Sequence, residues 1–198
     1  MSISLKTRKR LSPGESRAAA VAAARQLLRD EGVAAVTLKA VAAKIGKTHA
    51  NLLHHFGSAA GLHRALAEDI AATVSASISE AIGKRRRGEA SERDVVDAMF
   101  DAFSAERVGE LIGWIALTRQ REALEPVIET VKSIVEDFRE AGDPRPMDRI
   151  TLGLVLMAIG DSLVGDEVAG ASGLAREAVR DDAVGLIRGI AGDTPQTS

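Results

Sequence analysis

The chain has 198 residues, of which 45% are apolar and 27% charged, which is typical of a globular protein with one domain or a small domain joined to a larger one. It contains no cysteine, which excludes disulfides, a thiol nucleophile and a cysteine-ligated zinc site. No apolar run is long enough for a membrane span and no secretory leader is recognisable, so the expected location is the cytoplasm.

The net charge of −2 conceals an uneven distribution along the chain. Residues 1–64 hold 11 basic and 3 acidic side chains, a net charge of +8. Residues 65–198 hold 15 basic and 25 acidic side chains, a net charge of −10. A basic end on an acidic body favours contact between that end and nucleic acid.

The first third of the sequence predicts a basic arm followed by three helices. Residues 1–14 are polar and basic and are expected to form a flexible arm whose cations contact phosphates or the minor groove. A helix is predicted over residues 15–31, because apolar residues recur at three- and four-residue spacing before the C-cap Gly32. Thr37 and Thr48 are predicted N-caps of two further short helices.

These two short helices, 37–44 and 48–55, are separated by Gly46. The interval 37–56 has the length of a helix-turn-helix. The sequence of the remaining residues predicts longer helices, with a break at Pro144 and Pro146. Six are expected, over residues 58–82, 92–106, 108–118, 126–140, 148–164 and 174–190. The predicted fold is therefore all-α with about nine helices.

The second short helix carries the side chains best suited to reading DNA. In a helix-turn-helix, the N-terminal residues of the recognition helix meet base edges in the major groove. Asn51 suits an adenine edge, and Lys47 or a histidine suits a phosphate or a guanine. The alternative is that the three helices form only a packing unit. The predicted DNA contacts are Thr37, Lys39, Lys47, Thr48, His49, Ala50, Asn51, His54 and His55.

All four histidines lie between His49 and His63. Metal-binding pairs on a helix prefer a spacing of four, whereas His49 and His54 are five apart, and no carboxylate precedes Glu68 in this segment. The sequence therefore predicts no metal site, and DNA or solvent is the expected environment of these rings. The chain also lacks a glycine-rich phosphate loop and a Glu-x-x-His motif, so neither an enzyme nor a cofactor is predicted.

Residues 15–74 resemble the DNA-binding domain of the TetR family of bacterial regulators. The resemblance is carried by the alanine-rich Ala19–Gly32, by Thr37–Gly46, by Thr48–Phe56 and by Leu62. The family usually has Tyr where this chain has Leu53 and Lys where it has Ala59, and both family residues contact phosphates. Their absence is expected to weaken anchoring to the DNA backbone.

The resemblance implies that residues 75–192 form a ligand-binding and dimerisation domain. The helices 148–164 and 174–190 would form a four-helix interface with a second copy, so the homodimer would bind a palindromic operator. The implied function is a transcriptional repressor that a small-molecule effector releases from DNA. The alternative is a protein-interaction or ligand-binding module that has kept the fold and lost DNA binding.

The implied effector pocket lies within residues 92–164, where large apolar side chains gather. For each of these side chains, ordinary core packing is the alternative. Asp161 interrupts an apolar helix, and a buried carboxylate needs a partner. That partner could be an effector, Arg149, an arginine from another helix, or the rim of an interface. The predicted pocket residues are Met99, Phe100, Phe103, Trp114, Leu117, Met157 and Asp161.

Overall fold

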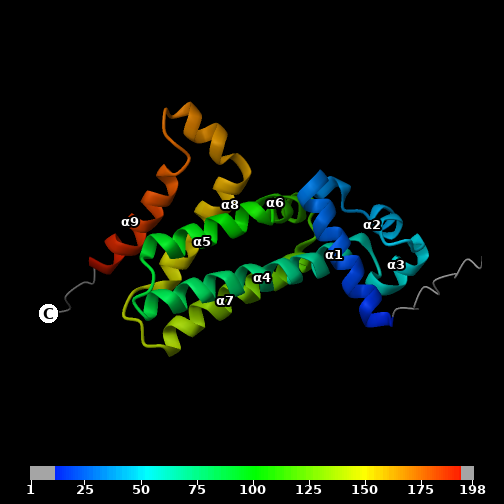
Figure 1. The fold of residues 1–198 in the computed structure, drawn as a ribbon, viewed down its shortest axis with the longest axis horizontal. Coiled ribbons are helices and arrows are strands. Elements are labelled where there is room, and N and C mark those ends of the chain that lie inside the picture. Colours follow the sequence, from blue (N-terminus) through cyan, green and yellow to red (C-terminus); the bar gives the residue numbers. More distant parts are fainter. Residues whose placement is uncertain (1–11, 193–198) are drawn as a thin grey trace, which may run out of the picture.

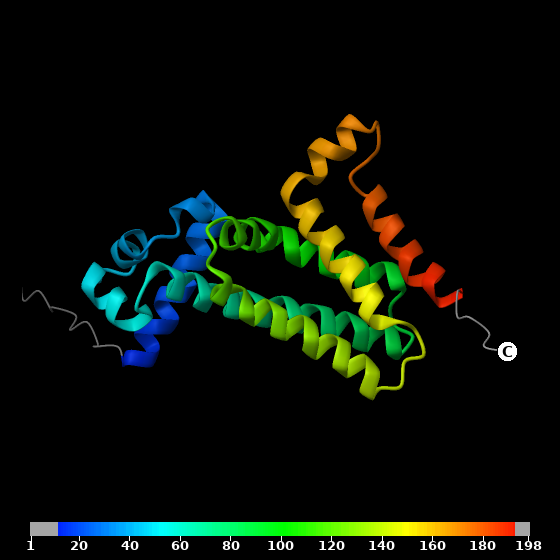
Figure 2. The same cartoon turned by 180° about the vertical axis from the view of Figure 1, so that it is seen from behind.

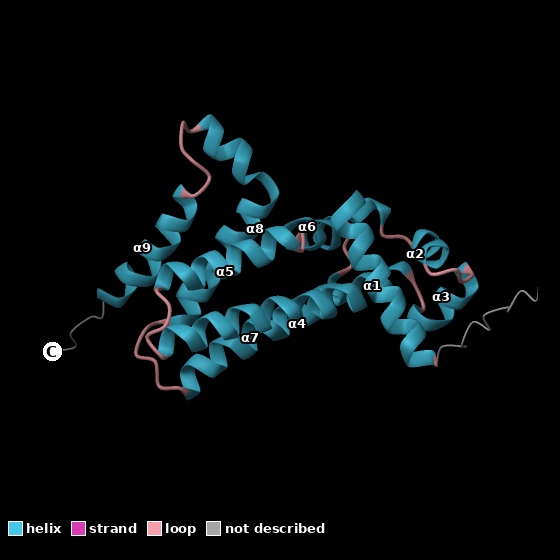
Figure 3. Ribbon diagram, in the orientation of Figure 1, coloured by secondary structure: helices cyan, strands magenta, loops and turns pink. Residues whose placement is uncertain are grey.

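The computed structural model describes residues 12–192, and the side chains of residues 12–189. Within this part of the chain the secondary structure is helical, without strands, which confirms the predicted all-α fold (Figure 3). The predicted arm falls almost entirely on residues 1–11, outside the described range. Nine α-helices and two short 3-10 helices are described: α1 (Pro13–Glu31), η1 (Val33–Ala35), α2 (Leu38–Lys44), α3 (His49–Phe56), α4 (Ala59–Arg86), α5 (Glu92–Ala105), α6 (Val108–Leu117), η2 (Arg121–Leu124), α7 (Glu125–Glu140), α8 (Met147–Ala171) and α9 (Ala178–Gly192).

Side-chain caps fix the starts of the first four helices. The hydroxyls of Thr37 and Thr48 accept hydrogen bonds from backbone N–H groups three residues later, as predicted. Helix α1 begins two residues earlier than expected, because Ser12 and Glu15 form a reciprocal capping box around Pro13.

Helices α1, α2 and α3 form one end of an elongated molecule, and α4 connects them to the rest (Figure 1). The first half of α4 buries Leu62 and Leu66 against these helices, and the second half packs on α5 and α7 in the body. Residue 74, the predicted domain boundary, lies inside α4 without a break in the helix. The two parts therefore share one continuous apolar core.

The body consists of α4 to α9. Helices α5 and α7 flank α4, whereas α8 and α9 pack on each other and extend away from the long axis (Figures 1 and 2). None of the described helices combines the length and the apolar character that crossing a membrane requires.

Two of the predicted helix ends are wrong. Helix α4 continues through Gly83 to Arg86, since one glycine costs a helix only about 1 kcal/mol and the last turn is basic. Helix α8 does not end at Val164; this residue has non-helical dihedral angles (φ −142°, ψ 17°) and forms a kink, after which the helix resumes. Helix α9 begins at Ala178 rather than at Leu174.

Candidate nucleic-acid interface and internal cavity

Helices α2 and α3 form a compact helix-turn-helix. The turn contains Gly46 at a φ of +66°, a left-handed conformation that suits glycine, and the Lys47 N–H donates to the Ala42 carbonyl at 2.9 Å. Each helix turns its apolar side to the domain core, leaving the opposite side of α3 to solvent. The buried residues are Leu38, Val41, Ala42, Leu52 and Phe56.

None of the nine predicted DNA contacts is buried. Lys47, Asn51 and His55 are half-buried, and the other six are exposed, namely Thr37, Lys39, Thr48, His49, Ala50 and His54. Thr37 and Thr48 use their hydroxyl oxygens as cap acceptors, at 3.1 and 3.2 Å, but each hydroxyl retains its proton for a phosphate oxygen.

Asn51 has an unusual environment. Its Oδ1 atom is buried and has no hydrogen-bond partner among the described residues. A buried polar atom without a partner lowers stability, and such atoms often lie at functional positions. Leu53 lies exposed on the same helix, and Ala59 is exposed at the start of α4, so neither position carries a phosphate-binding group.

Arg17 is a neighbouring cation that sequence analysis missed. It is exposed on α1, and its guanidinium lies 5.4 Å from the centre of the Phe56 ring, at the end of α3. Its charge counts towards the basic first third of the sequence, but its place beside α3 is set by the fold. Arg17 therefore adds positive charge beside the recognition helix.

His63 does not share the environment of the other three histidines. Only 4% of the residue is exposed, which corrects the expectation of DNA or solvent contact. Its ring nitrogens lie 2.9 Å from Gln120 Oε1 and 3.0 Å from the Val36 carbonyl oxygen. His63 thus joins the segment after η1 to the segment before η2, a structural role.

A partly buried ion-pair cluster connects the N-terminal helices to the body. Arg25 of α1 lies 2.7 Å from Glu106, at the end of α5, and 3.0 Å from Asp69 of α4. Arg29 lies 3.5 Å from the second Glu106 oxygen. The hydrogen bond from Arg25 lowers the pKa of Glu106, which therefore stays ionised in spite of its burial.

A second contact lies at the start of α6. The Val33 N–H donates to Glu110 Oε1 at 2.8 Å, and Arg107 pairs with the other Glu110 oxygen. Arg107 has a left-handed backbone with a φ of 51°, and its side chain donates to the Arg29 carbonyl. The junction between α5 and α6 is therefore the contact point for α1 and η1.

The body contains a cavity of about 190 Å³ between α4, α5, α6, α7 and α8. Of the predicted pocket residues, Met99 and Phe103 line this cavity. The other five predicted pocket residues lie elsewhere. Phe100 is fully buried with the Arg180 guanidinium 5.5 Å away, Leu117 is 86% exposed, and Trp114, Met157 and Asp161 are absent from the lining.

Branched aliphatic residues of α4 and α7 supply much of the cavity wall. Their periodic spacing in the sequence predicts which face of each helix points inward. It does not tell whether that face packs closely against other side chains or borders a cavity. The pocket prediction instead favoured large aromatic, methionine and leucine side chains and Asp161. The missed lining residues on these helices include Ile70, Val74, Ile78, Val127, Val131 and Ile134.

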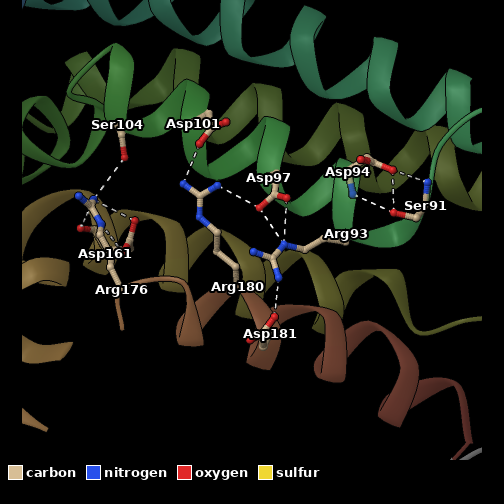
Figure 4. Close-up of polar contacts among 10 residues, drawn as sticks. All are labelled: Ser91, Arg93, Asp94, Asp97, Asp101, Ser104, Asp161, Arg176, Arg180 and Asp181. Atoms are coloured by element: carbon tan, nitrogen blue, oxygen red, sulfur yellow. Dashed lines mark hydrogen bonds and ion pairs between the residues drawn. The ribbon is translucent and has the colours of Figure 1, made fainter. Parts of the chain in front are cut away.

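Asp161 is paired within the chain. Arg176, in the loop before α9, contacts both of its carboxylate oxygens, at 3.0 and 3.1 Å, and its carbonyl oxygen at 3.0 Å (Figure 4). Of the open alternatives, the structure thus shows an arginine from outside α8, and not Arg149. A Cβ atom at Gly165 would lie 2.3 Å from Asp161 Oδ1, so glycine is required beside the kink at Val164.

Further ion pairs join α9 to α5 (Figure 4). Arg180 contacts Asp97 and Asp101, at 3.0 and 2.7 Å, and Arg93 bridges Asp97 and Asp181. These contacts hold α9 over the helix that carries Met99 and Phe103. The outer side of α8 has no such partners among the described residues and leaves five large apolar side chains exposed: Leu152, Leu156, Leu163, Val164 and Val168.

Comparisons with known proteins agree with the geometry of the N-terminal end. Residues 20–66 match the family model described as "Bacterial regulatory proteins, tetR family". No curated protein matches the chain significantly.

Two solved structures share the fold over nearly the whole length. One is "a protein with unknown function from Rhodococcus sp. RHA1", with a TM-score of 0.60 and 23% identity, covering 93% of this chain and 98% of that one. The other is "putative regulatory protein SCO4313", with a TM-score of 0.54 and 15% identity, covering 91% of this chain and 97% of that one.

Proposed function

We propose that the protein is a transcriptional repressor released by a small molecule, and the starting point is the match of residues 20–66 to the family model of TetR-type bacterial regulatory proteins. The observation that carries the proposal is the direct connection of this domain, through α4 and the Glu106 cluster, to a body with an apolar cavity. The repressor would act in the cytoplasm, where its operator is.

We propose that α3 enters the major groove and that Lys39, Lys47 and Arg17 contact the flanking phosphates. The exposure of His49, Ala50 and His54 supports this docking, because small and polar residues allow close approach to base edges.

The proposed functional unit is a homodimer formed through α8 and α9. The exposed apolar residues of α8 support this interface, since contiguous apolar surface is rarely left open to water. A Cβ atom at Gly160, Gly185 or Gly189 would meet nothing within 4 Å, so a partner helix has room to approach there. Gly153 instead accommodates Leu186 of the same chain. A two-fold dimer presents two recognition helices and hence requires a roughly palindromic operator.

In the proposed mechanism, an effector shifts the population between two conformations. One conformation holds the recognition helices at the spacing of the DNA grooves, and the effector binds the other conformation more tightly. Helix α4 lines the cavity with its second half and packs under α1 and α3 with its first, so a displacement at the cavity reaches the DNA-binding end.

The test is fluorescence anisotropy with labelled DNA from upstream of the protein's own gene, titrated with salt. We expect specific binding that weakens steeply as the salt concentration rises, because phosphate contacts release counterions. The exposed Leu53 and Ala59 favour a second candidate, a module without DNA binding. Equal affinity for the upstream fragment and for random DNA at low salt would establish that candidate and reject the repressor.

A further inference from the structure

We propose that the cavity binds an elongated hydrocarbon chain with one anionic head group, and that the head lies at the end of the cavity where α4 terminates. This inference rests on the proposed function, because it names the chemical class of the effector for the same cavity.

The cavity is long and narrow. Its lining residues on α4 run from Ala67 to Arg86, which corresponds to about 28 Å of helix at 1.5 Å per residue. The cavity is therefore elongated along α4, and we refer to it as a channel. A flexible chain fits this shape better than a fused ring system does.

The walls along most of the channel are hydrocarbon. The lining consists of aliphatic, methionine and phenylalanine side chains, and the hydroxyls of Ser75, Thr130 and Thr151 are its uncharged polar groups. An apolar channel of this kind favours methylene groups, and each additional buried methylene is worth about a fourfold gain in affinity.

All the charged lining residues belong to one end of the channel. They come from the last turn of α4, the first turn of α5 and the loop between α7 and α8, and they are Arg85, Arg86, Glu92, Asp143 and Arg145. Three arginines thus face two carboxylates, so the charge balance at this end is positive.

Two of the three arginines are already paired. Arg85 lies 2.8 Å from Glu92, and Arg145 lies 2.5 Å from Asp143. Arg188 contacts the second oxygen of Glu92 at 2.8 Å. No described carboxylate lies within ion-pair distance of Arg86. Its guanidinium instead lies 5.7 Å from the centre of the Phe138 ring, which also lines the channel. Arg86 is therefore the cation available to an anionic head group.

The test is isothermal titration calorimetry of the full chain with decanoate, decan-1-ol and decylamine. We expect decanoate to bind at least tenfold more tightly than decanol, and decylamine to bind most weakly. The binding affinity should rise from octanoate to decanoate to dodecanoate, by about fourfold for each added CH₂ group.

A substitution of Arg86 tests whether this residue binds the anionic head group. Arg86→Gln should weaken decanoate binding about tenfold and leave decanol binding unchanged. The matched control is Arg87→Gln, since Arg87 is exposed, pairs with Glu89 and does not line the channel. This control should bind both ligands as the unchanged protein does.

Three outcomes overturn parts of the proposal separately. Equal binding of decanol and decanoate, with no effect of Arg86→Gln, would reject the anionic head. Absence of binding by every chain, in protein that still binds its operator, would reject the hydrocarbon class and leave the repressor intact. Tight decanoate binding without any effect on operator affinity would confirm the ligand class and reject its role as an effector.

Discussion

Lys39 and Lys132 are both exposed lysines on helices, but their surroundings differ. Lys39 lies on α2 beside the recognition helix, whereas Lys132 lies on α7 of the body, 2.8 Å from Glu129. We expect Lys39→Ala to weaken binding to all DNA sequences alike and to reduce the slope of log K against log salt by about one. Lys132→Ala should leave the slope unchanged. Equal slopes for the two variants, measured by anisotropy titrations, would remove α2 from the DNA interface.

The ion pair between Asp161 and Arg176 is expected to contribute strongly to the free energy of unfolding. The side chain of Asp161 is 1% exposed, so removal of its partner leaves an uncompensated carboxylate. Arg176→Met should lower the free energy of unfolding by roughly 3–5 kcal/mol, measured by urea denaturation at fixed protein concentration. The control Arg87→Gln breaks an exposed pair and should cost at most about 1 kcal/mol. A similar small loss in both variants would show that Asp161 is satisfied without Arg176.

At the scale of the elements, Gly32 determines how α1 meets α6. Its φ of +88° and ψ of 171° are nearly restricted to glycine, and an added Cβ would lie 2.8 Å from Glu110 Oε1. Gly32→Ala should therefore destabilise the protein by about 1–3 kcal/mol in urea unfolding. Gly14→Ala, with nothing within 4 Å, should leave stability unchanged or raise it by up to about 1 kcal/mol. Equal stability of the two variants would mean that the junction adapts to a side chain.

Asp143, in the loop between α7 and α8, is expected to make the free energy of unfolding depend on pH in the acidic range. The hydrogen bond from Arg145 lowers the pKa of Asp143 to about 2, from an ordinary value of 3.8. The ionised form is thus favoured in the folded state, and this stabilisation is present above pH 4 and is lost as the pH falls towards 2.

We expect Asp143→Asn to flatten the decline in unfolding free energy between pH 4 and pH 2. The difference is of the order of 2 kcal/mol. Asp182→Asn provides the control, because Asp182 is exposed and forms no ion pair with a described residue. A decline as steep in Asp143→Asn as in this control would assign the acid sensitivity to other carboxylates.

The elements also show what local sequence can predict. Caps such as Thr37, Thr48 and Ser58 place helix starts correctly, because a side-chain hydroxyl and three backbone N–H groups suffice to define them. The predicted ends at residues 82 and 164 are wrong, because α4 continues through Gly83 to Arg86 and α8 resumes after the kink at Val164. The partner of Asp161 was not predictable, because Arg176 reaches it only through the fold of a loop 15 residues away.

At the scale of the whole molecule, the exposed residues of α8 test the proposed dimer. Leu156 is 59% exposed on α8, and Leu117 is 86% exposed at the end of α6. We expect Leu156→Glu to produce monomers in sedimentation velocity and to lower operator affinity at least tenfold, because a charge would be buried in the interface. Leu117→Glu should remain a dimer. A dimeric Leu156→Glu protein would place the interface elsewhere.

The shared helix α4 has a consequence for the architecture of such proteins. Because α4 runs without interruption from the helix-turn-helix into the body, it fixes the rotation of one part relative to the other about the helix axis. Each residue added to its middle would rotate one end against the other by about 100° and lengthen the molecule by about 1.5 Å. Insertions and chimaeric fusions within α4 are therefore compatible with both ends only where they add nearly whole turns, such as about 7, 11 or 18 residues.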